Sequence, residues 1–317
     1  MSLPDQAMEQ KAPGRRPSRP PVRDAGWGCL TGILAGVLGL GPWLVTGAHL
    51  PLQNMWGAEA GPDQMPVALL PLSQYQLTTI VALLTVGGAA AGLAVRIWSP
   101  ARRRLVVWCA AAGVLVVQVA AAVQSFTVLD AGLKDGTMAS LYVAGLLAGV
   151  TASIAAALVA LLLLSSRSRS LTALGAGLMA VPFASWALLW VVAFVGRTNI
   201  PLAVPTIGQW IPAVIVGCVL AWCGLRPARR AAVWAVDLAL LWVVPAVFTS
   251  VNYVLGTRML AGDLQEMLLM SQQILAATLG PAGGAAPKVL LALVIALAGL
   301  GAKSLVARRK RAAPTAS

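Results

Sequence analysis

The chain has 317 residues, of which 59% are hydrophobic and only 10% are charged. Soluble domains carry roughly 25% charged residues, so this composition excludes an ordinary water-soluble globular protein. The formal net charge of +13 sits in short clusters between apolar runs. That pattern is typical of the loops of membrane proteins, and no aromatic-rich basic surface indicates a nucleic-acid partner.

The two ends of the chain lack the apolar content of a folded core. Residues 1–25 are rich in Pro and Arg and are predicted to form a disordered cytoplasmic tail. Residues 308–317 are predicted to form a second, basic cytoplasmic tail.

Eight apolar runs lie between these tails, each long enough to cross about 30 Å of hydrocarbon with roughly 20 residues. They predict an all-α membrane protein with eight transmembrane helices. The predicted spans are 27–48, 77–97, 105–128, 139–164, 170–195, 205–225, 231–254 and 287–306.

The basic residues predict the orientation of these spans. If the N-terminus is cytoplasmic, all but four of the 23 Lys and Arg residues fall in cytoplasmic segments. The four on the outside are Lys134, Arg197, Arg258 and Lys288. This asymmetry follows the positive-inside rule and favours both termini in the cytoplasm. The abundance of Ala, Gly, Leu and Arg is typical of a high-GC bacterial genome, which predicts the bacterial plasma membrane.

Residues 259–279 have the pattern of an amphipathic helix outside the membrane. At 100° per residue, one face holds Leu260, Leu264, Met267, Leu268, Ser271 and Leu275, and the other holds Asp263, Gln265, Glu266, Gln272 and Gln273. We expect this helix to lie on the outer surface or to cap the bundle. Leu269 and Met270 interrupt the polar face, which leaves a re-entrant segment or a ninth span as alternatives.

The two halves of the chain resemble each other. The sequence Pro-Ala-Arg-Arg at 100–103 recurs at 227–230, and an ungapped alignment on it pairs Thr79-Ile80 with Thr206-Ile207. An even number of spans in each unit gives both copies the same orientation. The sequence therefore predicts two parallel four-helix repeats, residues 26–165 and 166–307, related by an axis along the membrane normal.

Three polar residues inside predicted spans are the candidate site residues. Asp237 is the acidic residue well inside a span, and burying such a group at the centre of a membrane helix costs at least about 2.5–3.5 kcal/mol. It could bind a proton or cation in a transporter, or pair with a loop Arg. Gln118 and Gln124 could join a polar transport cluster, or serve as hydrogen bonds between helices. Pro182, Pro212 and Pro245 predict kinks in three spans.

The remaining chemistry-bearing residues give no catalytic pattern. The single histidine, His49, and the four cysteines do not have the spacing of a metal site. The motifs of phosphate-binding loops, serine hydrolases and zinc proteases are also missing from the sequence. We therefore expect no enzymatic activity, no cofactor and no metal.

Two function classes fit these observations. The first is a non-catalytic membrane component that assembles with, or regulates, other envelope membrane proteins. The second is a small secondary transporter or permease-like subunit with a site near Asp237. A polar cavity shared by Asp237, Gln118 and Gln124 would favour the transporter, whereas separate helix contacts would favour the first class.

Overall fold

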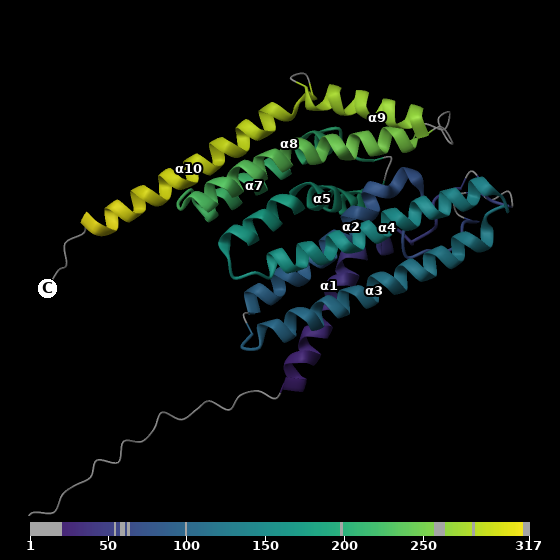
Figure 1. Cartoon of the computed structure of the whole chain (residues 1–317), viewed down its shortest axis with the longest axis horizontal. Helices are drawn as coiled ribbons and strands as arrows, with labels where there is room; N and C mark the ends of the chain where they lie inside the picture. Colours follow the sequence, from purple (N-terminus) through teal and green to yellow (C-terminus); the bar gives the residue numbers. More distant parts are fainter. Residues whose placement is uncertain are drawn as a thin grey trace, which may run out of the picture.

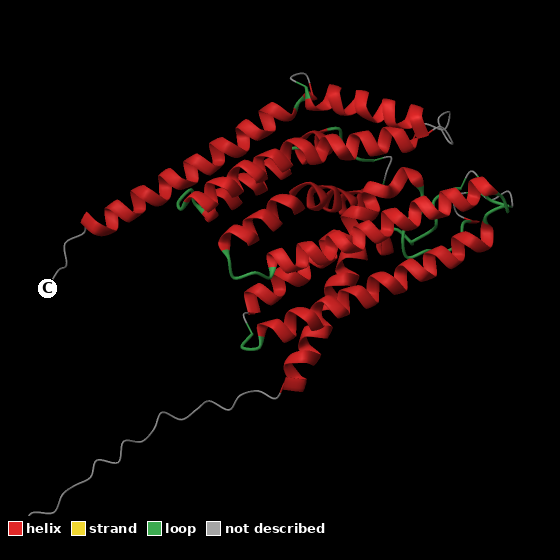
Figure 2. Ribbon diagram, in the orientation of Figure 1, coloured by secondary structure: helices red, strands yellow, loops and turns green. Residues whose placement is uncertain are grey.

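The computed structural model describes residues 21–312, apart from 54, 58–60, 62–63, 99, 197–198, 257–263 and 281–282. The described chain is helical, as Figure 2 shows. The helices are α1 (Pro21–Val45), η2 (Gln74–Gln76), α2 (Leu77–Trp98), α3 (Arg103–Gly132), α4 (Thr137–Leu164), α5 (Arg169–Val195), α6 (Ala203–Gly208), α7 (Ile211–Cys223), α8 (Ala228–Gly256), α9 (Leu264–Leu279) and α10 (Ala285–Ala312).

Within the described residues, eight helical segments are long and apolar enough to cross a membrane, in agreement with the predicted number of spans. The sixth consists of α6 and α7, separated by a break at 209–210 just before Pro212. The start of α1, the end of α10 and the loops that follow α2, α4 and α7 lie at one end of the bundle (Figure 1). We call this the basic end, because the arginine clusters are there, and the other end the outer end.

Both terminal helices are longer than the sequence predicts. Residues 1–20 of the predicted N-terminal tail lie outside the described residues, but α1 begins at Pro21. Asp24 in its first turn favours this start, because the N-terminus of a helix carries a partial positive charge. Likewise α10 continues to Ala312, through the first residues of the predicted basic tail.

The first half of the bundle depends on glycines that let helix backbones touch. Gly32 of α1 lies against the Ala110 carbonyl of α3, and Gly113 of α3 lies against the Cys29 carbonyl of α1. Gly92 of α2 lies against α4, where an added Cβ would come 2.6 Å from the carbonyl oxygen of Leu161. Small residues at such crossings allow close van der Waals packing, which is the main attraction between helices in lipid.

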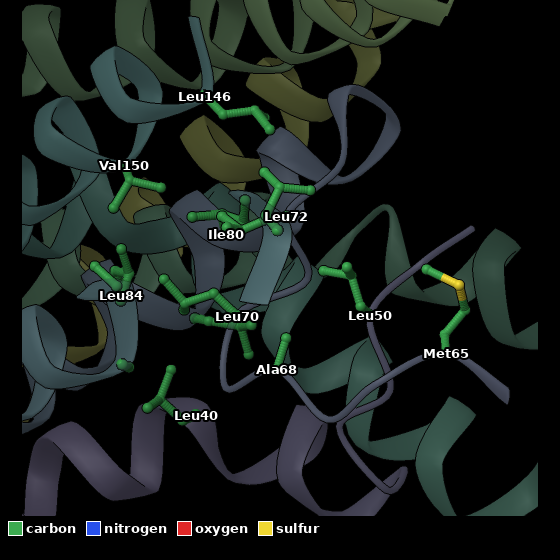
Figure 3. Close-up of a cluster of buried hydrophobic side chains, with 14 residues drawn as sticks. Leu40, Leu50, Met65, Ala68, Leu70, Leu72, Ile80, Leu84, Leu146 and Val150 are labelled. Atoms are coloured by element: carbon green, nitrogen blue, oxygen red, sulfur yellow. The ribbon is translucent and has the colours of Figure 1, made fainter. Parts of the chain in front are cut away.

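The loop between α1 and α2 fills the outer end of this half. Leu70 and Leu72 of the loop are completely buried and pack with Leu40, Ile80 and Leu84 of α1 and α2. Figure 3 shows Leu70 among these helix side chains rather than at the surface. We call residues 64–72 the plug, because their buried side chains, above all Leu70 and Leu72, occupy the interior between the helices of the first half, although Gln64 and Val67 are exposed.

The second half repeats the pairing of the first but packs less tightly. In the first half α1 packs against α2 and α3, and α2 against α4. In the second half α5 packs against α7 and α8, and α7 against α10. The α7–α10 contact again uses glycine, since Gly217 lies against Ala292 and Ile295. The order of pairing along the chain is therefore the same in both halves.

Helix α5 joins the halves through a row of aromatic rings. Phe183, Trp186, Trp190 and Phe194 follow one side of the helix, with neighbouring ring centroids 5.5–5.9 Å apart. The Trp186 indole donates a hydrogen bond to the Gly39 carbonyl of α1 over 2.9 Å. Because Trp rings combine a large apolar area with one donor, this row fixes α5 against the first half.

Helix α9 runs antiparallel to the outer half of α8. Its C-terminal carbonyl, at Leu279, accepts a 3.1 Å hydrogen bond from the Trp242 indole. Closer to the outer end, the hydroxyls of Ser271 of α9 and Ser250 of α8 are 3.0 Å apart. A helix is present as predicted, but it lies alongside α8 and meets α10 midway along the bundle (Figure 1).

The glycine contacts predict unequal effects of adding one methyl group. Gly92→Ala should lower stability by about 1–3 kcal/mol, because α2 and α4 must move apart to admit the Cβ. Gly145→Ala in α4 is the matched control, since an added Cβ there meets nothing within 4 Å. Thermal unfolding in detergent measures both, and equal melting temperatures would contradict the close approach of α2 and α4.

Candidate functional site

Gln124 of α3 holds the plug in place. Its amide nitrogen donates to the Val67 carbonyl over 2.9 Å, and its amide oxygen accepts from the Leu69 N–H over 2.9 Å. The next residue, Ser125, accepts from the Leu70 N–H over 2.8 Å. These bonds satisfy backbone groups of a non-helical segment, so Gln124 has a structural partner at each end of its side chain.

Gln118 lies two turns deeper on α3 and contacts α2. Its side chain is 1% exposed, and its amide nitrogen donates to the Leu84 carbonyl over 2.8 Å. Its amide oxygen has no hydrogen-bond partner among the described residues. Gln118 therefore links α3 to α2 through the nitrogen of its side-chain amide, while the amide oxygen stays unbonded among the described residues.

Asp237 of α8 is buried against α5. Its side chain is 0% exposed, and neither carboxylate oxygen has a hydrogen-bond partner within the described part of the chain. The carboxylate lies against Gly177 of α5, where a Cβ would clash with it. Only a residue without a side chain leaves room for the acid at this contact.

The three predicted site residues do not come together. Gln124 bonds the plug, Gln118 bonds α2 within the first half, and Asp237 faces α5 in the second half. Their side chains occupy three separate contacts. This is the arrangement that counts against a shared polar transport site.

The sequence did not indicate a cavity of about 810 Å³ at the outer end between the halves. It is lined by the ends of α1, α2 and α5 and includes His49, Gln76 and Thr79. The His49 ring nitrogen Nδ1 lies 2.9 Å from the Met65 carbonyl of the plug segment. His49 thus helps to fix the loop that forms one wall of this cavity.

A second cavity, of about 450 Å³, lies at the basic end between α2, α4, α5 and α7. Its lining is apolar apart from Arg96 and Thr172, which are hydrogen-bonded to each other over 2.7 Å. Trp222 at its edge lies beneath two guanidinium groups, with Arg96 5.4 Å and Arg169 5.7 Å from the ring centroid. From the sequence these residues indicated only topology and an interfacial belt, because three different helices bring them together.

No three His, Cys, Asp or Glu residues gather in a metal-binding arrangement anywhere in the described ranges. Comparison with family models, with curated proteins and with solved structures gave no match. The functional argument therefore depends on the geometry of this chain alone.

The bonds of Gln124 predict that the plug opens when this side chain is lost. Gln124→Leu leaves the part-buried Leu69 N–H without its partner, at up to about 1–3 kcal/mol, whereas the exposed Val67 carbonyl can bond to water instead. Hydrogen exchange at Leu69 and Leu70 should accelerate by more than tenfold. Thr127→Val is the control, because Thr127 bonds only the Gln124 carbonyl of its own helix. Unchanged exchange in Gln124→Leu would contradict the assignment of Gln124 to the plug.

The surroundings of Asp237 predict that its charge is dispensable for folding. Removing one member of a buried ion pair costs about 3–5 kcal/mol, but Asp237 has no such partner among the described residues. Asp237→Asn keeps the size of the side chain and should change stability by less than about 1 kcal/mol. Thermal unfolding in detergent provides the measurement. A loss of several kcal/mol would show that Asp237 has a basic partner.

Proposed function

We propose that this chain is a non-catalytic component of the bacterial plasma membrane that assembles with, or regulates, other envelope membrane proteins. The proposal rests on one observation: the rest of the chain buries some spans much more than others. In the most apolar stretch of α2, 67% of the residues are buried within the chain, whereas in α10 the share is 11%. The buried share is 33–67% in the four spans of the first half and 11–28% in those of the second half, and it is lowest in α10.

The two faces of α10 differ in what covers them. Ala292 and Ala296 are buried against α7, and Gly299 lies against Ala221. The opposite face presents Leu290, Val294 and Leu297, all exposed, followed by Gly301 with open space around it. Apolar side chains beside a small residue let a neighbouring helix approach closely. A partner helix packed on this face would complete the half that this chain leaves open.

The proposal includes the repeat and the orientation. The equal order of helix pairing in the two halves supports two parallel four-helix repeats, and the Pro-Ala-Arg-Arg sequences precede or begin α3 and α8 at equivalent places. The collection of arginines at one end supports a cytoplasmic location for that end. In this orientation α9 lies beside the outer half of α8 as a re-entrant helix rather than flat on the membrane surface.

The alternative of a secondary transporter is disfavoured by the separation of Asp237, Gln118 and Gln124. The outer cavity near His49 is the observation that keeps this alternative testable. Substrate uptake into proteoliposomes that is lost in Asp237→Asn, with folded protein retained, would replace the assembly proposal by transport.

The open face of α10 predicts a position-specific loss of a partner. Val294 is 62% exposed on α10, and Leu147 is 51% exposed on α4. Val294→Trp should reduce a stoichiometric partner roughly tenfold or more, because a bulky ring at the centre of a packed interface prevents helix approach. Leu147→Trp, the matched control at an exposed position of the first half, should retain the partner.

Purification into native nanodiscs from the source cell, followed by quantitative mass spectrometry, measures the partner in each variant. A photo-crosslinking residue at 294 should give one discrete adduct, and the same residue at 147 should give none. A wild-type protein that carries no stoichiometric partner, or equal retention in both variants, would overturn the proposal.

A further inference from the structure

The cavity at the basic end combines an apolar chamber with a cationic rim, which consists of Arg96 and Arg169 around Trp222. Val86, Ala89, Ala176 and Met179 line its wall, and Leu93 and Ile97, both exposed, stand at its edge. It therefore opens on the side of the bundle that faces the hydrocarbon. Its volume of about 450 Å³ falls within the roughly 300–1,000 Å³ of ordinary ligand sites.

Several guanidinium groups gather at this cavity. Arg96 lines it, and Arg169 lies over Trp222 at its edge. Arg103 donates to the Ser165 carbonyl, and Arg96 donates to the Ser166 carbonyl of the same loop.

The described acidic residues near this rim are fewer than its guanidinium groups. Asp24 and Asp237 are buried in α1 and α8, and Asp237, like Arg169, lies near Cys223. Asp130, Asp135 and Glu266 belong to the outer end, in or beside the last turns of α3 and the first turn of α9. A ligand with an acidic group would thus find an excess of positive charge.

We propose that this cavity binds an anionic phospholipid, with one acyl chain in the apolar chamber and the phosphate against Arg169 and Arg96. Basic pockets between transmembrane helices on the cytoplasmic side are suited to acidic lipid headgroups. The Trp222 ring holds the guanidinium groups in position by cation–π contact and covers the transition from acyl chain to headgroup. The proposal is independent of whether the chain has a protein partner.

The chemistry of the rim also argues against the nearest alternative occupant. The first 20 residues of the chain lie outside the described part, and they carry Lys11, Arg15, Arg16 and Arg19. A segment with the same sign of charge as the rim would be repelled. The lipid complements the rim in charge and the chamber in polarity.

The experiment titrates the full-length protein in neutral detergent with dioleoyl-phosphatidylglycerol or dioleoyl-phosphatidylcholine and counts bound lipid by native mass spectrometry. Phosphatidylglycerol should bind on the order of tenfold more tightly, because the net value of a hydrogen bond to a charged group corresponds to about that factor. Equal binding of the two lipids would overturn the proposal. So would competition by glycerol phosphate as strong as that of the whole lipid.

Two variants locate the site. Arg169→Gln, at an exposed position, should weaken phosphatidylglycerol binding about tenfold and leave phosphatidylcholine binding unchanged. Ala176→Phe fills the chamber and should weaken both lipids. Arg229→Gln removes one exposed charge at the same end away from the cavity and serves as the control. If Arg229→Gln weakens phosphatidylglycerol binding as much as Arg169→Gln, the attraction belongs to the whole basic end and the proposed site is wrong.

Discussion

A backbone N–H or C=O group buried away from water must find a partner within the protein, and the organisation of this chain follows from that constraint. The helices satisfy it internally. The plug cannot, because residues 64–72 form no helix or strand beyond isolated bridges. Some of its backbone groups bond other loop backbone, as the Ala68 N–H does to the Ala48 carbonyl, and others are bonded by side chains from the surrounding helices. Gln124, Ser125 and the Trp43 indole each bind one part of it.

The two glutamine side chains in the interior of the first half already have hydrogen-bond partners within the protein. Gln124 could line a polar route only if the plug were released, and Gln118 is already bonded to α2. Leu70 and Leu72 of the plug fill the space between α1, α2 and α4 with apolar atoms. The same hydrogen bonds that stabilise the first half therefore occupy Gln124 and one end of the Gln118 amide with structural partners. The second half has no described counterpart of the plug, and it is also the half with the least cover.

The sequence predicted the features that depend on one segment at a time. Hydropathy located the eight spans, and the arginines indicated which of their ends lie together. It failed where several segments combine. Leu70 and Leu72 belong to an apolar stretch too short to cross the membrane, and nothing local distinguishes a buried loop from an exposed one. In the same way, the amphipathic pattern at 259–279 indicated a helix but not its neighbour, and the Ser271–Ser250 contact decides its course.

Asp237 and Ala110 stand at the same distance from the two Pro-Ala-Arg-Arg sequences, but their contacts differ. The alignment on the Pro-Ala-Arg-Arg sequences places Asp237 opposite Ala110. In the first half Gly32 packs directly on the backbone at Ala110, whereas in the second half Gly177 packs on the carboxylate of Asp237. An acid thus stands at 237 where the aligned position, 110, has a methyl group, and Gly177 leaves room for the carboxylate. An unpaired carboxyl at this contact weakens the attraction between α5 and α8, because its oxygens gain no partner for the water they lose.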